Sequence, residues 1–232
     1  MIDLDKSGGI WTVTINRPEK ANSLTLEMLT ELALIAESAG AAQALIITGV
    51  GKVFSAGADL DQARAGLAVS DIWERLSGAI ATLPCLTIAA LNGTLAGGAM
   101  GMVLACDIRI AVPTAKFFYP VMKLGFLPQP SDPKRMAALI GPARTKLILM
   151  GGQKITAAEA LNFGLVERLV ASEELMVHAN ELCLDVLNAS PQIALGIKAM
   201  CRQPLRQSFR HCIDGFKLVK VKPCSEKIWK RS

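Results

Sequence analysis

The sequence predicts an α/β fold with one substantial core, and three observations support this. Short apolar runs alternate with segments of helical periodicity up to about residue 170. Beyond that point two segments of helical pattern are followed by a basic, poorly patterned tail. Of the 232 residues, 51% are hydrophobic and 19% are charged, which is typical of a folded globular protein and excludes a disordered one. We therefore expect a sheet-containing core over residues 1–170 and a C-terminal helical region over residues 171–232.

The expected strands follow two patterns. Residues 10–15 alternate, with Trp11, Val13 and Ile15 on one face and two threonines on the other, as in a strand with one wet face. Residues 44–48 form a short apolar run, which is typical of a strand buried on both faces. Further strands are expected at residues 86–91, 108–111 and 165–170.

Helices are expected at residues 24–39, 72–83, from about 134, from about 143, 157–163, 173–188 and 191–203. Ser23 or Thr25 is placed to cap the first of them. Thr156 and Glu159 form a capping box, and Gly164 supplies the stop signal for the helix between them. The proline-rich segment 117–133 is expected to be a stiff, irregular wall and not a helix.

The net charge of +5 is placed unevenly along the chain. Residues 198–232 hold ten Lys and Arg against Asp214 and Glu226, a local net of +8, which leaves −3 for the rest. A solvated face, an anionic ligand, a partner subunit or nucleic acid would each explain such a basic tail.

The cysteines and the apolar segments limit the class of protein further. The six cysteines show no CxxC pair and no metal-like spacing with the two histidines, so we expect no metal site. With no signal peptide at the start, the expected compartment is a reducing cytoplasm. No charged residue lies between Arg75 and Asp107, but Pro84 and several glycines divide this stretch, so no membrane span is expected.

Two turns made of small residues are the candidate sites for binding an anion through backbone N–H groups. A strand-like run enters an Asn92-Gly93 turn, and the pair Gly97-Gly98 then opens an apolar helical segment. A sharp turn into a helix presents free backbone N–H groups, which can hold a phosphate or a developing oxyanion. A second such turn is formed by residues 54–60, with the sequence Phe-Ser-Ala-Gly-Ala-Asp-Leu.

These two turns, in this order, together with Ala105-Cys106-Asp107 and residues 151–166 (GGQKITAAEALNFGLV), resemble the crotonase (enoyl-CoA hydratase/isomerase) superfamily. The resemblance implies a spiral of ββα turns with a C-terminal helical part that packs trimers, often stacked as hexamers. It also implies acyl-CoA ligands and no separate cofactor. The backbone N–H groups of Ala58 and Gly98 would form an oxyanion hole for the thioester oxygen.

The resemblance also places the nucleotide of CoA. Ala56, Asp59 and Leu60 would line its adenine pocket, and Lys20 and Ala21 would contact the nucleotide from the loop after the first strand. Lys20 could pair with a CoA phosphate or be an ordinary solvated lysine. The chain ends at residues 227–232 without the final amphipathic helix of many relatives, so the trimer contact and the cover over CoA are expected to differ.

The chain departs from the family at the acid–base positions. The two glutamates of the hydratases would fall at Gly101 and Val121, and the nucleophilic aspartate of dehalogenase-type members would fall at Gln129. Since neither glycine nor valine transfers a proton, hydration by two carboxylates is not supported. Tyr119 and Asp132 remain as acid–base candidates, although either could instead be structural, Tyr119 as a wall residue and Asp132 as a helix cap.

Three functions are compatible with these residues. The first is an enzyme that stabilises a thioester enolate for isomerisation, decarboxylation or another α-carbon reaction. The second is an acyl-CoA-binding protein with little catalysis. The third, which the sequence favours least, is a nucleic-acid-binding protein that uses the basic tail.

Overall fold

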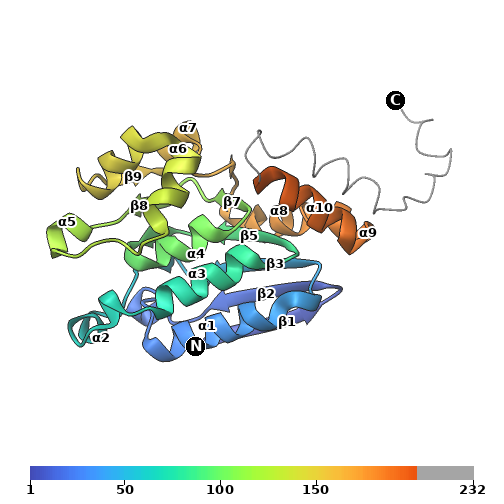
Figure 1. The fold of residues 1–232 in the computed structure, drawn as a ribbon, viewed down its shortest axis with the longest axis horizontal. Coiled ribbons are helices and arrows are strands. Elements are labelled where there is room, and N and C mark those ends of the chain that lie inside the picture. Colours follow the sequence, from blue (N-terminus) through green and yellow to red (C-terminus); the bar gives the residue numbers. More distant parts are fainter. Residues whose placement is uncertain (203–232) are drawn as a thin grey trace.

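The computed structural model describes residues 1–202. They form two sheets with helices packed against them (Figure 1). The larger sheet has the strand order β1-β2-β3-β5-β7-β10. Its strands are Ile2–Ser7, Ile10–Ile15, Ala44–Gly49, Leu86–Leu91, Ile108–Ala111 and Arg168–Leu169. The smaller sheet has the order β4-β6-β8-β9, with strands Val53–Ser55, Thr94–Ala96, Lys116–Phe118 and Ile155–Thr156.

The strands follow a repeating path through the two sheets. The pairs β3–β4, β5–β6 and β7–β8 each give one strand to the larger sheet and the next strand to the smaller one. As a result, β3, β5 and β7 are parallel neighbours in one sheet, and β4, β6 and β8 are parallel neighbours in the other. Helices follow each pair, which confirms the expected spiral of ββα turns.

Three helices, α1 (Leu26–Ser38), α3 (Ile72–Thr82) and α4 (Met100–Ala105), lie side by side over the larger sheet (Figure 1). The strands beneath them are buried, as expected for parallel strands covered by helices. Thr25 and not Ser23 caps α1, because its side chain accepts a hydrogen bond from the Met28 N–H at 3.2 Å. The expected strands at 10–15, 86–91 and 108–111 are confirmed residue for residue.

The region after β8 differs from the expectation. The prediction that residues 117–133 contain no helix was wrong, because they hold the one-turn helix α5 (Val121–Leu124). Pro120 precedes α5 and Gly125, with φ of 72°, ends it, so the breakers flank a helical turn without interrupting it. The longer helix α6 (Asp132–Leu149) is kinked at Gly141-Pro142, which accounts for the two helices expected there.

The C-terminal part of the described chain is helical, as expected. Helix α7 (Ala157–Phe163) has the capping box at Thr156 and Glu159 and ends at Gly164, as predicted. The helix expected at 173–188 is divided into α8 (Leu175–Glu181) and α9 (Leu184–Asn188), and α10 spans Pro191–Arg202. The basic tail lies almost wholly outside the described residues, and the division of the chain at residue 170 stays a prediction.

Different helices lie at the two ends of the described structure. Short α2 (Leu60–Arg64) and α5 lie at one end, and α8, α9 and α10 gather at the other (Figure 1). In the part of the chain that is described, no helix combines the length and apolar character needed to span a membrane.

Candidate functional site

The two glycine turns of the sequence meet in space. A Cβ atom on Gly57 would lie 2.9 Å from the Ala96 carbonyl oxygen and 3.3 Å from the Gly97 Cα, so only glycine allows this approach. Gly57 also has a φ of 90°, which side chains rarely tolerate. The end of β4 is thereby held directly against the end of β6.

The N–H group of Ala58 points away from Leu24, the residue with which Ala58 forms an isolated parallel bridge. Leu24 N–H donates to the Gly57 oxygen at 2.8 Å, and Asp59 N–H donates to the Leu24 oxygen at 2.9 Å. This parallel bridge uses the groups on either side of Ala58 and leaves the Ala58 N–H on the opposite side.

The N–H group of Gly98 lies at the start of a helical segment. Gly98 belongs to the short 3-10 turn Gly97–Ala99, which continues directly into α4. N–H groups in the first turn of a helix have no partner within the helix. The indole ring of Trp73 covers Gly98 so closely that a Cβ atom there would lie 3.2 Å from three ring carbons.

Both donors line one cavity of about 380 Å³ at the α2 and α5 end of the molecule. Its wall is mainly apolar, and Tyr119, Lys123 and Gln129 contribute polar groups. The predicted residues Ala56, Ala58, Leu60, Gly98 and Tyr119 all line it, so the structure brings together five residues selected from the sequence.

Three predicted nucleotide contacts lie outside the lining of this cavity. Lys20 is exposed in the 3-10 turn Pro18–Lys20, next to Ala21, whose carbonyl accepts a hydrogen bond from the Ala56 N–H at 3.0 Å. The Asp59 carboxylate pairs with Arg17 at 2.8 Å and caps α2 through the Asp61 and Gln62 N–H groups. The hydrogen bond from Arg17 holds the pKa of Asp59 below its usual value. In this structure the Asp59 side chain therefore fixes the loop that carries Ala58.

The two acid–base candidates form one hydrogen-bonded pair. The Tyr119 hydroxyl donates to Asp132 Oδ2 at 3.0 Å, and both residues are buried. Burial raises the pKa of Asp132 to about 7, with Glu74 adding to the rise while Tyr119 and Arg135 oppose it. Burial and the neighbouring Asp132 also raise the pKa of Tyr119. Asp132 is the first residue of α6, but it makes no cap: its carboxylate turns to Tyr119.

The positions where the resemblance places the hydratase glutamates lie close to this pair. Gly101 on α4 faces Asp132, and Val121 lines the cavity two residues after Tyr119. Gln129, the dehalogenase-type position, also lines the cavity, and its amide donates to the Ala68 carbonyl at 3.2 Å. The proximity of Asp132 to Gly101 could not be read from the sequence, because the two residues belong to different helices.

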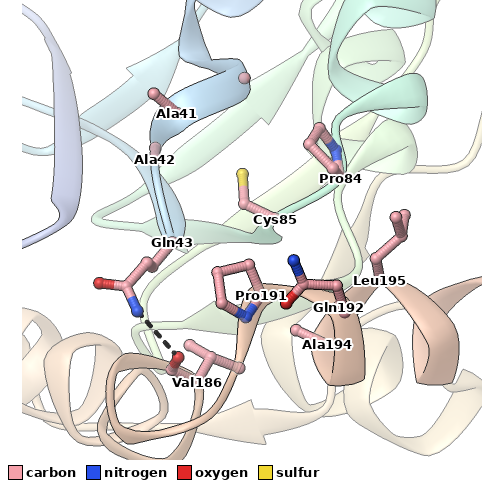
Figure 2. Close-up of a pocket in the computed structure, with 11 residues that line it drawn as sticks. Ala41, Ala42, Gln43, Pro84, Cys85, Val186, Pro191, Gln192, Ala194 and Leu195 are labelled. Carbon is pink, nitrogen blue, oxygen red and sulfur yellow. Dashed lines mark hydrogen bonds between the residues drawn. The ribbon is translucent and has the colours of Figure 1, made fainter. Parts of the chain in front are cut away.

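A second cavity, of about 260 Å³, lies under α10 and is drawn in Figure 2. Gln43 donates across it to the Val186 carbonyl at 3.3 Å. Among its described lining residues only Cys85 is titratable, and burial raises the pKa of that thiol, which disfavours the reactive thiolate. The described residues also contain no His, Cys, Asp and Glu cluster suited to a metal ion. The larger cavity is therefore the candidate site.

Comparison with known proteins agrees with the family resemblance seen in the sequence. A family model described as enoyl-CoA hydratase/isomerase matches residues 5–227. YngF of Bacillus subtilis, whose name assigns it to the enoyl-CoA hydratases/isomerases, is 36% identical over 189 residues, covering 77% of this chain and 72% of that protein. The short-chain-enoyl-CoA hydratase of Clostridium acetobutylicum is 34% identical over 201 residues, covering 81% and 76%.

A solved structure shares the fold as well. A Thermobifida fusca protein assigned to the enoyl-CoA hydratases, determined in complex with CoA, superposes with a TM-score of 0.85 at 28% identity and covers 93% of this chain and 91% of that one. The ββα spiral, the match over nearly the whole sequence and these relatives agree: the chain belongs to the enoyl-CoA hydratase/isomerase family and has the crotonase fold.

Proposed function

We propose that this protein is an enzyme that binds an acyl-CoA thioester in the 380 Å³ cavity and stabilises the enolate form of the acyl group. The thioester oxygen is held between the N–H groups of Ala58 and Gly98. The observation that carries the proposal is the contact of the two glycine turns, which sets both donors on one cavity. A Thermobifida fusca relative with CoA bound supports CoA thioesters as the ligand class.

The physical reason is the change of charge during enolate formation. The carbonyl oxygen of a thioester becomes negative as the enolate forms, so fixed N–H donors stabilise the transition state more than the ground state. In oxyanion holes of other enzyme families the loss of one donor costs about 3 kcal/mol of this stabilisation. The apolar wall of the cavity strengthens such interactions by excluding water.

We propose one of two reactions in preference to hydration. The first is proton transfer at the α-carbon that leads to isomerisation, and the second is decarboxylation. Hydration by the two-glutamate route needs a carboxylate at each of positions 101 and 121, which hold glycine and valine. We further propose that the protein acts in the cytoplasm as a homotrimer or hexamer and that CoA enters only as part of the substrate. Lys20, Ala21, Ala56, Asp59 and Leu60 would surround its nucleotide.

The test is incubation with saturated, enoyl and malonyl-type CoA thioesters in D2O, followed by mass spectrometry. We expect deuterium at the α-carbon, a shifted double bond or loss of CO2. Tight binding to all three classes with no chemical change would refute the enzyme and leave an acyl-CoA-binding protein. The acyl-CoA-binding function is supported by the same cavity, but it requires no acid or base.

A matched pair of variants isolates the donor. Gly98→Ala and Gly98→Pro both place a Cβ atom against Trp73, but only proline removes the N–H group. We expect Gly98→Pro to abolish turnover and Gly98→Ala to retain more of it. Equal turnover in the two variants, with both folded, would contradict the assignment of Gly98 as a donor.

A further inference from the structure

Asp132 is a buried carboxylate with an incomplete set of partners. Its side chain is fully buried at the start of α6, where Oδ2 accepts the hydrogen bond from Tyr119. Its other oxygen, Oδ1, has no hydrogen-bond partner among the described residues. Buried carboxylates are costly unless their oxygens are satisfied, so this arrangement reduces stability. Buried ionisable groups with perturbed pKa values cluster at functional sites, which makes Asp132 a candidate functional residue.

The missing side chain at position 101 makes room for this carboxylate. A Cβ atom on Gly101 would lie 2.8 Å from Asp132 Oδ1 and 3.3 Å from Oδ2. Any larger residue at position 101 would displace the carboxylate. Asp132 therefore brings a carboxylate from α6 to the place that a side chain at position 101 would take.

The charged groups around the pair come from two helices, α3 and α6. Glu74 on α3 accepts hydrogen bonds from the Ser131 N–H, at 2.9 Å, and from the Ser131 hydroxyl, which holds a negative charge near the start of α6. Arg135, one turn further along α6, supplies a positive charge. Tyr119, after β8, supplies the direct hydrogen bond. Of the pair, only Tyr119 lines the cavity, together with Ala58 and Gly98.

We propose that Tyr119 and Asp132 form one acid–base unit for the enolate chemistry, in which Tyr119 touches the substrate and Asp132 accepts the proton through it. This inference rests on the proposed function and identifies the base that the proposed function leaves open. It replaces the two-glutamate arrangement with one carboxylate that acts through a phenol.

The step balances without any further reactant. The C–H bond at the α-carbon breaks, and its electron pair moves into the enolate, whose oxygen the Ala58 and Gly98 N–H groups hold. The proton passes to the Tyr119 oxygen while the Tyr119 hydroxyl proton passes to Asp132 Oδ2. Because burial raises the pKa of Tyr119, the phenol stays neutral before and after the step. The reverse transfers return a proton to the α-carbon or, for isomerisation, to the γ-carbon.

The unit also defines the substrate class. A base that removes an α-proton acts on acyl thioesters that carry hydrogen at that carbon, with no need for a carboxylate on the acyl group. The cavity wall beside Tyr119, formed by Val121, Leu124 and Phe126, is apolar and suits a hydrocarbon chain. We expect thioesters with a saturated α-carbon, that is saturated and 3-enoyl thioesters, to exchange their α-protons.

The test compares wild-type protein with Asp132→Asn and Tyr119→Phe. Asparagine keeps the shape and the oxygen that accepts from Tyr119 but takes up no proton. General acid–base catalysis contributes about 10²- to 10⁴-fold, so we expect each variant to lose at least about 10²-fold in α-proton exchange. The double variant should lose little more, because the two residues act as a unit. Asp185→Asn, which alters an exposed carboxylate on α9, is the matched control and should exchange at the wild-type rate.

A pH profile separates this role from a structural one. The wild-type exchange rate should rise with pH through about 7, as Asp132 loses its proton, and the Asp132→Asn profile should be flat there. CoA affinity should be unchanged in both variants. If folded Asp132→Asn protein keeps the wild-type rate and profile, the unit is refuted while the proposed function stands. If wild-type protein exchanges no thioester, the enzyme proposal fails and the unit fails with it.

Discussion

The contact between the two glycine turns makes a specific prediction for Gly57→Ala. The new Cβ atom would lie 2.9 Å from the Ala96 oxygen and would push β4 and β6 apart, although neither Ala58 nor Gly98 loses its N–H group. If this separation takes one donor out of reach, the loss is about 3 kcal/mol of transition-state stabilisation, or roughly 10²- to 10³-fold in turnover.

The same substitution has a cost in stability that a control can separate. Alanine in a left-handed conformation costs about 1–2 kcal/mol, and the forced contact adds about 1–3 kcal/mol. Gly164→Ala is the matched control, because Gly164 has a φ of 83° against 90° for Gly57, but its Cβ atom would meet only the Leu139 oxygen at 3.5 Å. Gly164→Ala should lose about 1–2 kcal/mol in urea unfolding and keep its turnover.

The assay measures α-proton exchange of an acyl-CoA in D2O under conditions where both variants are folded. Gly57→Ala should be at least about 10²-fold slower than Gly164→Ala. If the two variants exchange at rates within about twofold of wild type, the contact of the turns has no bearing on catalysis, and the reasoning is refuted.

Three further predictions concern stability and catalysis. The free energy of unfolding should fall as pH rises from about 4 to about 7, because the unfolded chain gives up the Asp132 proton before the folded protein does; Asp132→Asn should flatten this slope in urea unfolding at a series of pH values. Thr156→Ala should lower the free energy of unfolding by about 0.5–2 kcal/mol by removing the capping box of α7, and an unchanged urea midpoint would contradict this. Asp59→Asn should lower kcat more than it raises the KM for acyl-CoA, because it weakens the Arg17 contact that fixes the loop carrying the Ala58 N–H group; steady-state kinetics that show the opposite split would contradict this.

Local signals in the sequence were sufficient for most of the elements. The alternation at residues 10–15, the apolar run at 86–91 and the capping box at Thr156 each predict their own element, because neighbouring residues determine it. Strand β1 was not predicted, since only Ile2 among its residues is buried and it forms through its pairing with β2. Edge strands of this kind depend on a partner that periodicity does not reveal.

The candidate site was predictable only in part. Glycines mark both donor turns in the sequence, and the resemblance connects them. The pairing of Tyr119 with Asp132 depends on the path of the chain through α5 and α6, and the space over Gly101 depends on how α4 packs against α6. Such contacts between elements leave no local pattern. Tyr119 and Asp132 could be nominated as separate candidates, but not recognised as one unit.

The most direct test of the oxyanion hole is a crystal structure with a slowly reacting acyl-CoA bound. We expect the thioester oxygen to lie about 2.7–3.1 Å from the backbone nitrogens of both Ala58 and Gly98, with the α-carbon facing Tyr119. A thioester placed elsewhere, for example in the cavity under α10, or an oxygen in contact with neither nitrogen, would contradict the proposed site.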